Sequence, residues 1–172
     1  MIIKPQDIVV ALKLSLGSQR PSYAELALNL RMSPSEVHSA VRRLVEARLL
    51  DPEAHTVRRE ALREFLVHGV PYAFPARSGE VTRGIPTAWA AQALANKFGT
   101  TDQLPPVWPD PEGPVQGVLV RPLYPSVPRA VRQDPALHDL LAVVDALRLG
   151  RARERALAAQ ELEQRLSHHA TA

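Results

Sequence analysis

Apolar residues recur at helical spacing along the first 70 residues of the chain. Residues 5–16 are typical: Pro5 and Asp7 stand where helices begin, apolar residues follow at intervals of three and four, and Gly17 stands where helices end. Between residues 49 and 58 the pattern changes to a short strand, a Pro-containing turn and a return strand. This order predicts four helices, over residues 5–16, 22–30, 33–48 and 59–68.

The pattern is interrupted after residue 70 by proline. Of the 16 prolines in the chain, 11 fall between Pro71 and Pro128. Proline has no backbone N–H and ends helices and central strands, so long regular elements are not expected there. Residues 70–130 are therefore predicted to form a Pro-rich irregular segment, with one short helix in residues 87–99 and one strand in residues 117–124.

Helical spacing returns in residues 131–172, where two amphipathic runs are separated by Gly150. They predict a C-terminal helical hairpin, which completes a chain of three parts: residues 1–69, 70–130 and 131–172. The first run carries an apolar stripe of Leu137, Leu141 and Val144. We expect this stripe to pair with a second copy and form a homodimer; the alternative is that it packs on the core of its own chain.

The motif S-x-x-E occurs twice, at Ser22/Glu25 and at Ser33/Glu36. In such a capping box the serine hydroxyl accepts a hydrogen bond from the third helical N–H, and the glutamate accepts one from the N–H of the serine. Pro34 adds the residue preferred in a first turn. Two helices separated by only about three residues are expected to cross steeply, as in a helix-turn-helix unit.

The second of these helices is predicted to have one apolar and one polar face. Projection of residues 34–48 at helical spacing places Val37, Ala40, Val41 and Leu44 on one side. The opposite side carries Ser35, Ser39, Arg42 and Glu46, flanked by His38 and Arg43. Short serines allow close approach to a major groove, and arginine reaches guanine edges and phosphates.

The stretch YAELALNLRMSPSEVHSAVRRLVEARLLD resembles the winged helix-turn-helix regulators, in particular the MarR-like bacterial repressors, over roughly residues 4–66. The resemblance implies that Pro34–Arg48 is the recognition helix and that Leu50–Arg58 is a wing that touches the DNA backbone or minor groove. Two positions depart from the family pattern. Arg31 stands where the family usually has glycine, and the short wing has only His55, Arg58 and Arg59 at its base.

The expected fold is mainly α: a winged helix-turn-helix domain with a small β wing, a Pro-rich middle segment and a C-terminal helical hairpin. The expected function is sequence-specific binding of double-stranded DNA by a homodimeric transcriptional regulator. The residues expected to contact DNA are Ser22, Ser33, Ser35, His38, Ser39, Arg42, Arg43, His55, Arg58 and Arg59. The alternative is a protein-interaction adaptor or antitoxin-like partner that grips another protein through aromatic residues of the Pro-rich segment, namely Tyr72, Phe74, Trp89 and Trp108.

Composition and the absence of certain motifs exclude several classes of function. The net charge is only +3, so an argument from charge depends on where the arginines lie. Cysteine is absent, which excludes disulfides, thiolate nucleophiles and cysteine zinc sites. The sequence contains no G-x-S-x-G, Walker or H-x-x-x-H motif, so neither enzyme, cofactor nor metal site is expected. No apolar run approaches the roughly 20 residues of a membrane span, and the N-terminus lacks a signal-peptide pattern, which predicts a cytoplasmic protein.

Overall fold

The computed structural model describes residues 2–168 and confirms that the chain is mainly helical. The four helices expected in the first third are present as α1 (Pro5–Ser15), α2 (Tyr23–Leu30), α3 (Pro34–Glu46) and α4 (Arg59–His68). The expected C-terminal hairpin is present as α7 (Pro135–Leu149) and α8 (Ala152–His168), and residues 169–172 of that segment lie outside the described residues. Between residues 2 and 168, no helix is both long and apolar enough to cross a membrane.

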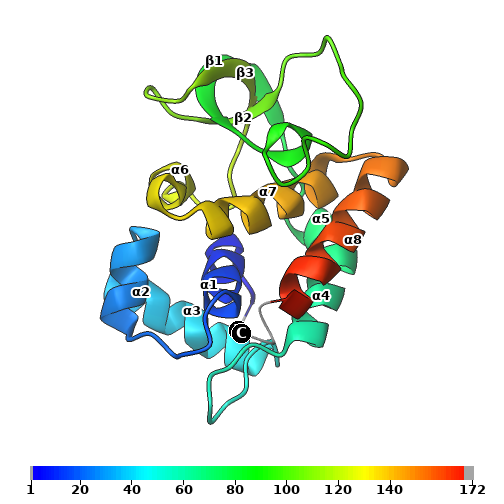
Figure 1. Ribbon diagram of the computed structural model, residues 1–172. Helices are drawn as coiled ribbons and strands as arrows, with labels where there is room; N and C mark the ends of the chain where they lie inside the picture. The colour runs from blue at the N-terminus through cyan, green and yellow to red at the C-terminus, as the bar shows by residue number, and fades with distance from the viewer. Residues whose placement is uncertain (1, 169–172) are drawn as a thin grey trace.

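Helices α1 and α7 form the centre of the molecule. Residues 8–12 of α1 are fully buried, and α1 contacts α2, α3 and α7. Figure 1 shows α1 in the middle, with α2 and α3 on one side and α4 and α8 on the other. One continuous apolar cluster extends from Ile8 to Leu166, so all three predicted segments contribute to a shared core.

The leucine stripe of α7 is buried within its own chain. Leu137, Leu141 and Val144 are almost completely inaccessible, and α7 contacts α1, α4, α5 (Val70–Ala73) and α8. The prediction that this stripe pairs with a second subunit is therefore wrong. The spacing correctly identified an apolar face, but spacing alone does not say which surface covers that face, and here other elements of the same chain do.

The Pro-rich segment contains a regular element that its composition did not predict. Strands β1 (Ser78–Pro86), β2 (Pro106–Pro109) and β3 (Val115–Val120) close into a small barrel, in which β1 pairs antiparallel with both partners and β2 pairs parallel with β3. The predicted irregular segment is thus corrected. The strand expected at residues 117–124 is β3, but the helix expected at residues 87–99 is limited to one 3₁₀ turn, η1 (Ala88–Ala90), followed by turns.

Two glycines let the strands of this barrel approach closely. A Cβ atom on Gly84 would lie 1.9 Å from the carbonyl oxygen of Trp108, and one on Gly117 would lie 2.1 Å from that of Pro105. Such distances are far inside van der Waals contact, so only a hydrogen fits at either position. Closure of the sheet within so few residues therefore depends on these glycines.

A buried acid, Asp145 of α7, fastens the barrel to the helices. Its carboxylate accepts hydrogen bonds from Thr87 Oγ1 at 2.8 Å and from Trp108 Nε1 at 2.7 Å, and it pairs with the Arg148 guanidinium at 2.6 Å. Burial raises the pKa of Asp145, while the Arg148 charge and the two neutral donors oppose that rise. Trp108 is only 1% exposed. It therefore does not belong to the aromatic docking surface that the adaptor hypothesis assumed.

Candidate nucleic-acid interface

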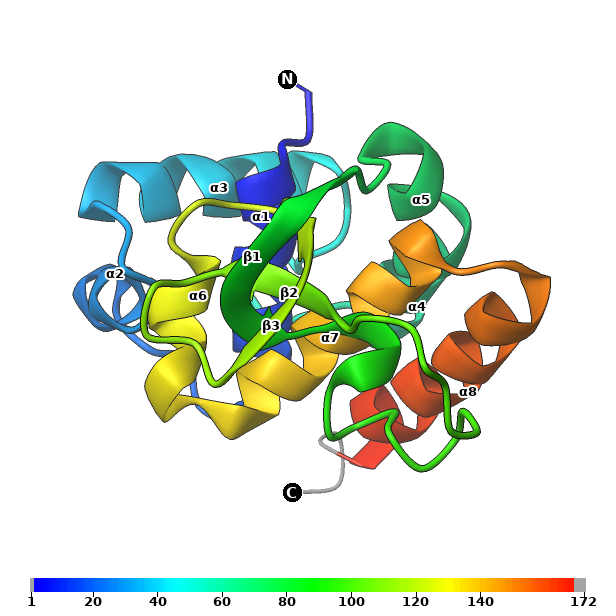
Figure 2. The ribbon, with the colours of Figure 1, turned by 90° about the horizontal axis from the view of Figure 1, so that it is seen from above.

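The α2–α3 unit begins both of its helices with the expected capping boxes. Ser22 Oγ accepts a hydrogen bond from the Glu25 N–H at 3.1 Å, and the Ser22 N–H donates to the Glu25 carboxylate at 2.8 Å. Ser33 and Glu36 repeat this arrangement at 3.2 and 2.8 Å. Figure 2 shows α2 end-on and α3 lengthwise, so the two helices cross steeply. The sequence therefore predicted both helix starts and the crossing correctly.

The tight connection between these helices depends on a left-handed residue. Arg31 ends α2 with φ 55° and ψ 40°, and its N–H donates to the carbonyls of Ala27 and Leu28. A residue with a Cβ in this conformation costs about 1 kcal/mol relative to glycine. The carbonyl of Leu30, which α2 leaves unpaired, accepts a hydrogen bond from Ser126 Oγ at 2.7 Å. The region after β3 thus supports the end of α2.

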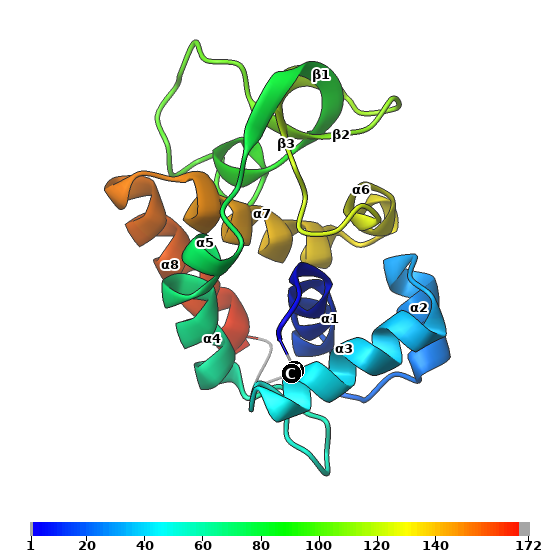
Figure 3. The ribbon, with the colours of Figure 1, turned by 180° about the vertical axis from the view of Figure 1, so that it is seen from behind.

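The outer face of α3 carries most of the side chains that the sequence placed there. Val37, Ala40, Val41 and Leu44 are buried, as predicted from helical spacing. In Figure 3, α3 lies on the near side of the molecule. Four of the residues expected to contact DNA are exposed on this helix: Ser35, His38, Ser39 and Arg42. Ser33 Oγ lies 3.1 Å from Ser35 Oγ, so the two hydroxyls form a continuous polar edge at the start of α3.

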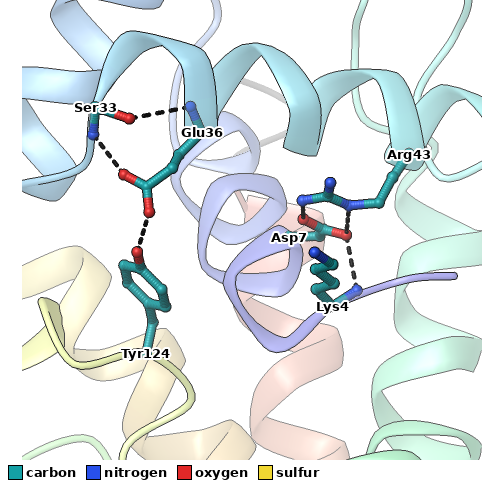
Figure 4. A network of polar contacts seen from close by, with 6 residues as sticks. All are labelled: Lys4, Asp7, Ser33, Glu36, Arg43 and Tyr124. Atoms are coloured by element: carbon teal, nitrogen blue, oxygen red, sulfur yellow. Dashed lines mark hydrogen bonds and ion pairs between the residues drawn. The ribbon is translucent and has the colours of Figure 1, made fainter.

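Arg43 does not belong to this face, and its expected DNA contact is corrected. Its Nε and terminal nitrogen donate to the two carboxylate oxygens of Asp7 at 2.8 and 2.6 Å. Asp7 is fully buried at the start of α1, where it also accepts the Lys4 N–H, and the Arg43 side chain is only 10% exposed (Figure 4). The hydrogen bonds to Asp7 raise the pKa of Arg43. The helical projection put Arg43 at the margin of the polar face, and in three dimensions that margin faces α1.

The expected wing is reduced to a tight turn. One isolated antiparallel bridge joins Leu50 to Val57, and no strand forms on either side of it in residues 49–58. The Asp51 carboxylate accepts the N–H groups of Glu53 and Ala54 at 3.0 and 2.8 Å, which closes the loop and lowers the pKa of Asp51. His55 has φ 53°, so the chain reverses before a ladder develops. The two-stranded wing is therefore corrected to a single bridge.

The two arginines at the base of this turn have different roles. Arg58 is about half exposed, with its guanidinium 3.9 Å from the Asp51 carboxylate, and stays available to a ligand. Arg59 instead donates to the carbonyls of Ser15 and Leu166 at 2.8 and 2.9 Å, and burial lowers its pKa. It joins α1, α4 and α8 and is corrected from a DNA-contacting residue to a structural one.

Three of the predicted residues meet at one hollow. His38, Arg42 and His55 contribute to a cavity of about 390 Å³ between the start of α2, the outer flank of α3 and the turn after it. Tyr23 packs edge-on against His38 at 5.4 Å between ring centroids, and Arg20 lies 5.9 Å from the Tyr23 ring. Within the described residues, His55 Nδ1 is buried without a hydrogen-bond partner. The hollow therefore presents both basic and aromatic groups beside α3.

The sequence did not identify the other residues that surround α3. Arg20, Arg31 and Arg48 are exposed in the connections before and after α2 and α3. Because these arginines stand just outside the ends of the two predicted helices, the sequence could have indicated that they lie beside α3. The Tyr124 hydroxyl donates to the Glu36 carboxylate, which lowers the pKa of Glu36 and raises that of Tyr124 (Figure 4). No local sequence pattern predicts this contact, because the two residues are 88 positions apart.

The described part of the chain, residues 2–168, contains no group of three His, Asp or Glu side chains arranged to hold a metal ion. No family model matches the sequence, and no curated protein or solved structure is significantly similar to it. Its function is therefore inferred from the α2–α3 surface itself.

Proposed function

We propose that this protein is a sequence-specific DNA-binding transcriptional regulator that places α3 in the major groove of double-stranded DNA. The observation that carries this proposal is the outer face of α3, on which Ser35, Ser39 and Arg42 are exposed. The MarR-like resemblance of the sequence agrees with this use of the helix.

The dimensions and chemistry of α3 suit a major groove. Its 13 residues span about 20 Å, and a helix with its side chains is about 10–12 Å wide, close to the width of the groove. Two serines near its first turns permit close approach, and Arg42, farther along, is long enough to reach a base edge or phosphate. Arg43 is committed to Asp7, so Arg42 is the one arginine of α3 assigned to recognition.

Basic side chains around α3 supply the contacts to phosphate. Arg20, Arg48 and Arg58 are exposed in the connections next to α2 and α3. Such contacts release counterions from DNA, so the affinity should fall steeply as salt concentration rises. The single-bridge turn offers His55 and Arg58 for this purpose in place of a strand-built wing.

The leucine stripe of α7 is buried within its own chain, so it does not hold two copies of the protein together on DNA. The number of copies that bind one duplex therefore has to be measured separately. Two copies on one duplex would place their α3 helices about 34 Å apart, one helical turn. Selection of bound fragments from a random duplex library measures this directly, since paired half-sites indicate two copies and a single short motif indicates one.

The decisive variant is Arg42→Ala, compared with Arg153→Ala, which removes an exposed arginine from α8. Fluorescence anisotropy with a selected duplex should show that Arg42→Ala weakens binding by about 1–3 kcal/mol, whereas Arg153→Ala binds like the wild type. Failure to select any sequence, or equal affinity of both variants with the fold intact, would refute the proposal.

A second candidate is a protein-interaction adaptor, the alternative that the sequence left open. Trp89 and the half-exposed Leu104 line a cavity of about 460 Å³ between the barrel and the junction of α7 and α8. Tyr72, on α5, is 72% exposed. An adaptor would show no salt-sensitive retention on duplex DNA. It would bind one protein stoichiometrically and lose it on Trp89→Ala but not on Arg42→Ala.

A further inference from the structure

A basic groove lies apart from the outer face of α3. It has a volume of about 760 Å³ and is bounded by the later part of α1, the end of α2, α6 (Val127–Ala130), η2 (Val131–Gln133) and the start of α7. In Figure 2, α3 runs along one edge of the molecule, while η2 and the start of α7 lie on the side away from it. A rod-like duplex seated on α3 therefore leaves this groove open.

Basic side chains outnumber acidic ones in the lining of the groove. Lys13, Arg31, Arg129 and Arg132 line it, with Asp134 as the acidic member. Lys13 Nζ lies 2.6 Å from the Asp134 carboxylate, and Arg132 is held by Asp110 and Glu112 at 2.8 and 2.7 Å, so these two cations are already neutralised locally.

The other two arginines have no counterion. Arg31 and Arg129 are exposed, and among residues 2–168 neither guanidinium has an ion pair or hydrogen bond. Two like charges that face one hollow repel each other, and an anion between them removes that repulsion. The planar guanidinium also matches the oxygens of phosphate in a two-point contact.

The remaining lining residues restrict the kind of anion. Asn29 and Gln133 supply amides that donate and accept hydrogen bonds, as ligand hydroxyls require. Among the described residues that line the groove, Leu28 is the one large apolar side chain and none is aromatic, so a nucleobase would find no ring to stack on there. The volume lies within the range of small-molecule sites.

We propose that this groove binds a small phosphorylated, hydroxyl-bearing metabolite, with its phosphate between Arg31 and Arg129. Arg31 belongs to the turn that leads into α3, and Arg129 lies on α6, which follows the serine that holds the end of α2. The bound ligand would bridge these two elements and steady the α2–α3 turn. This site is independent of the proposed function, because its recognition requires no DNA.

The test is a titration of the full chain followed by amide NMR. The probes are inorganic phosphate, glycerol 3-phosphate, ribose 5-phosphate and glucose 6-phosphate, with glucose as the uncharged counterpart. We expect saturable shifts centred on residues 28–31 and 129–134 with at least one sugar or glycerol phosphate, tighter than with inorganic phosphate, and none with glucose.

Two variants remove the proposed contacts without disturbing the fold. Arg129→Ala truncates an exposed side chain, and Arg31→Gly removes the charge while glycine suits the left-handed turn. Each should weaken binding at least about tenfold, and Arg153→Ala should not. The proposal is overturned by no saturable response to any phosphate probe, by shifts centred on α3 instead, by inorganic phosphate binding as tightly as the best organic phosphate, or by unchanged affinity in both variants.

Discussion

Replacement of Arg43 by alanine should destabilise the protein, although a DNA-contact role would have predicted a change in binding alone. The Arg43 guanidinium makes two hydrogen bonds to Asp7, whose side chain is fully buried. After the substitution, the Lys4 N–H is the hydrogen-bond donor left to that carboxylate among residues 2–168. The variant therefore leaves the buried carboxylate without its charged partner.

The size of the effect follows from this geometry. Removal of one member of a buried ion pair costs about 3–5 kcal/mol. The Arg43 side chain keeps a small exposed fraction, so water can partly replace it, and the lower end, about 3 kcal/mol, is expected. At about 2–4 °C per kcal/mol for a chain of this size, Tm should fall by about 10 °C.

Urea unfolding followed by tryptophan fluorescence measures this loss, because Trp108 is buried in the native state. The matched control is Arg42→Ala, one position earlier and exposed, which should change the free energy of unfolding by no more than about 0.5 kcal/mol. Combining Asp7→Ala with Arg43→Ala should cost less than the sum of the single changes. The reasoning is refuted if Arg43→Ala is as stable as Arg42→Ala.

Two further predictions concern the barrel and the start of α3. Gly84→Ala should lower the free energy of unfolding by at least about 2 kcal/mol, because the new methyl group would collide with the Trp108 carbonyl. The control in urea titrations is Gly99→Ala, whose methyl group meets nothing within 4 Å. Equal urea midpoints for the two variants would contradict the expectation. Tyr124→Phe removes the donor that lowers the pKa of Glu36. The lowered pKa of Glu36 stabilises the wild type at pH values above about 4.3, the pKa of glutamate in the unfolded chain, and this stabilisation is lost as pH falls through the folded-state pKa. The wild type should therefore lose more stability on acidification than the variant. Parallel pH profiles of the two proteins would refute the link.

Local signals in the sequence predicted the helices well. The boxes at Ser22 and Ser33 join residues only three positions apart, and their hydrogen bonds form wherever the helices form. Helical spacing likewise identified the buried side of α3 and its exposed residues Ser35, Ser39 and Arg42. Features set within one or two turns can be inferred without knowledge of the rest of the fold.

The errors at Arg43, Arg59 and the barrel concern contacts between distant parts of the chain. Arg43 meets Asp7 across 36 positions, and Arg59 meets Leu166 across 107. Neither partner can be identified from spacing, so both arginines looked like free surface cations. The barrel was missed for a similar reason: proline content argued against regular structure, whereas closure depends on where Gly84 meets the Trp108 backbone.

The burial of α1 between the early and late helices also bears on how the protein is made. α1 leaves the ribosome well before α7, which covers part of it, has been synthesised. Until then the apolar flank of α1 faces water and is a target for chaperones or for association with other nascent chains. The α2–α3 pair thus gains its final support only after α7 has emerged.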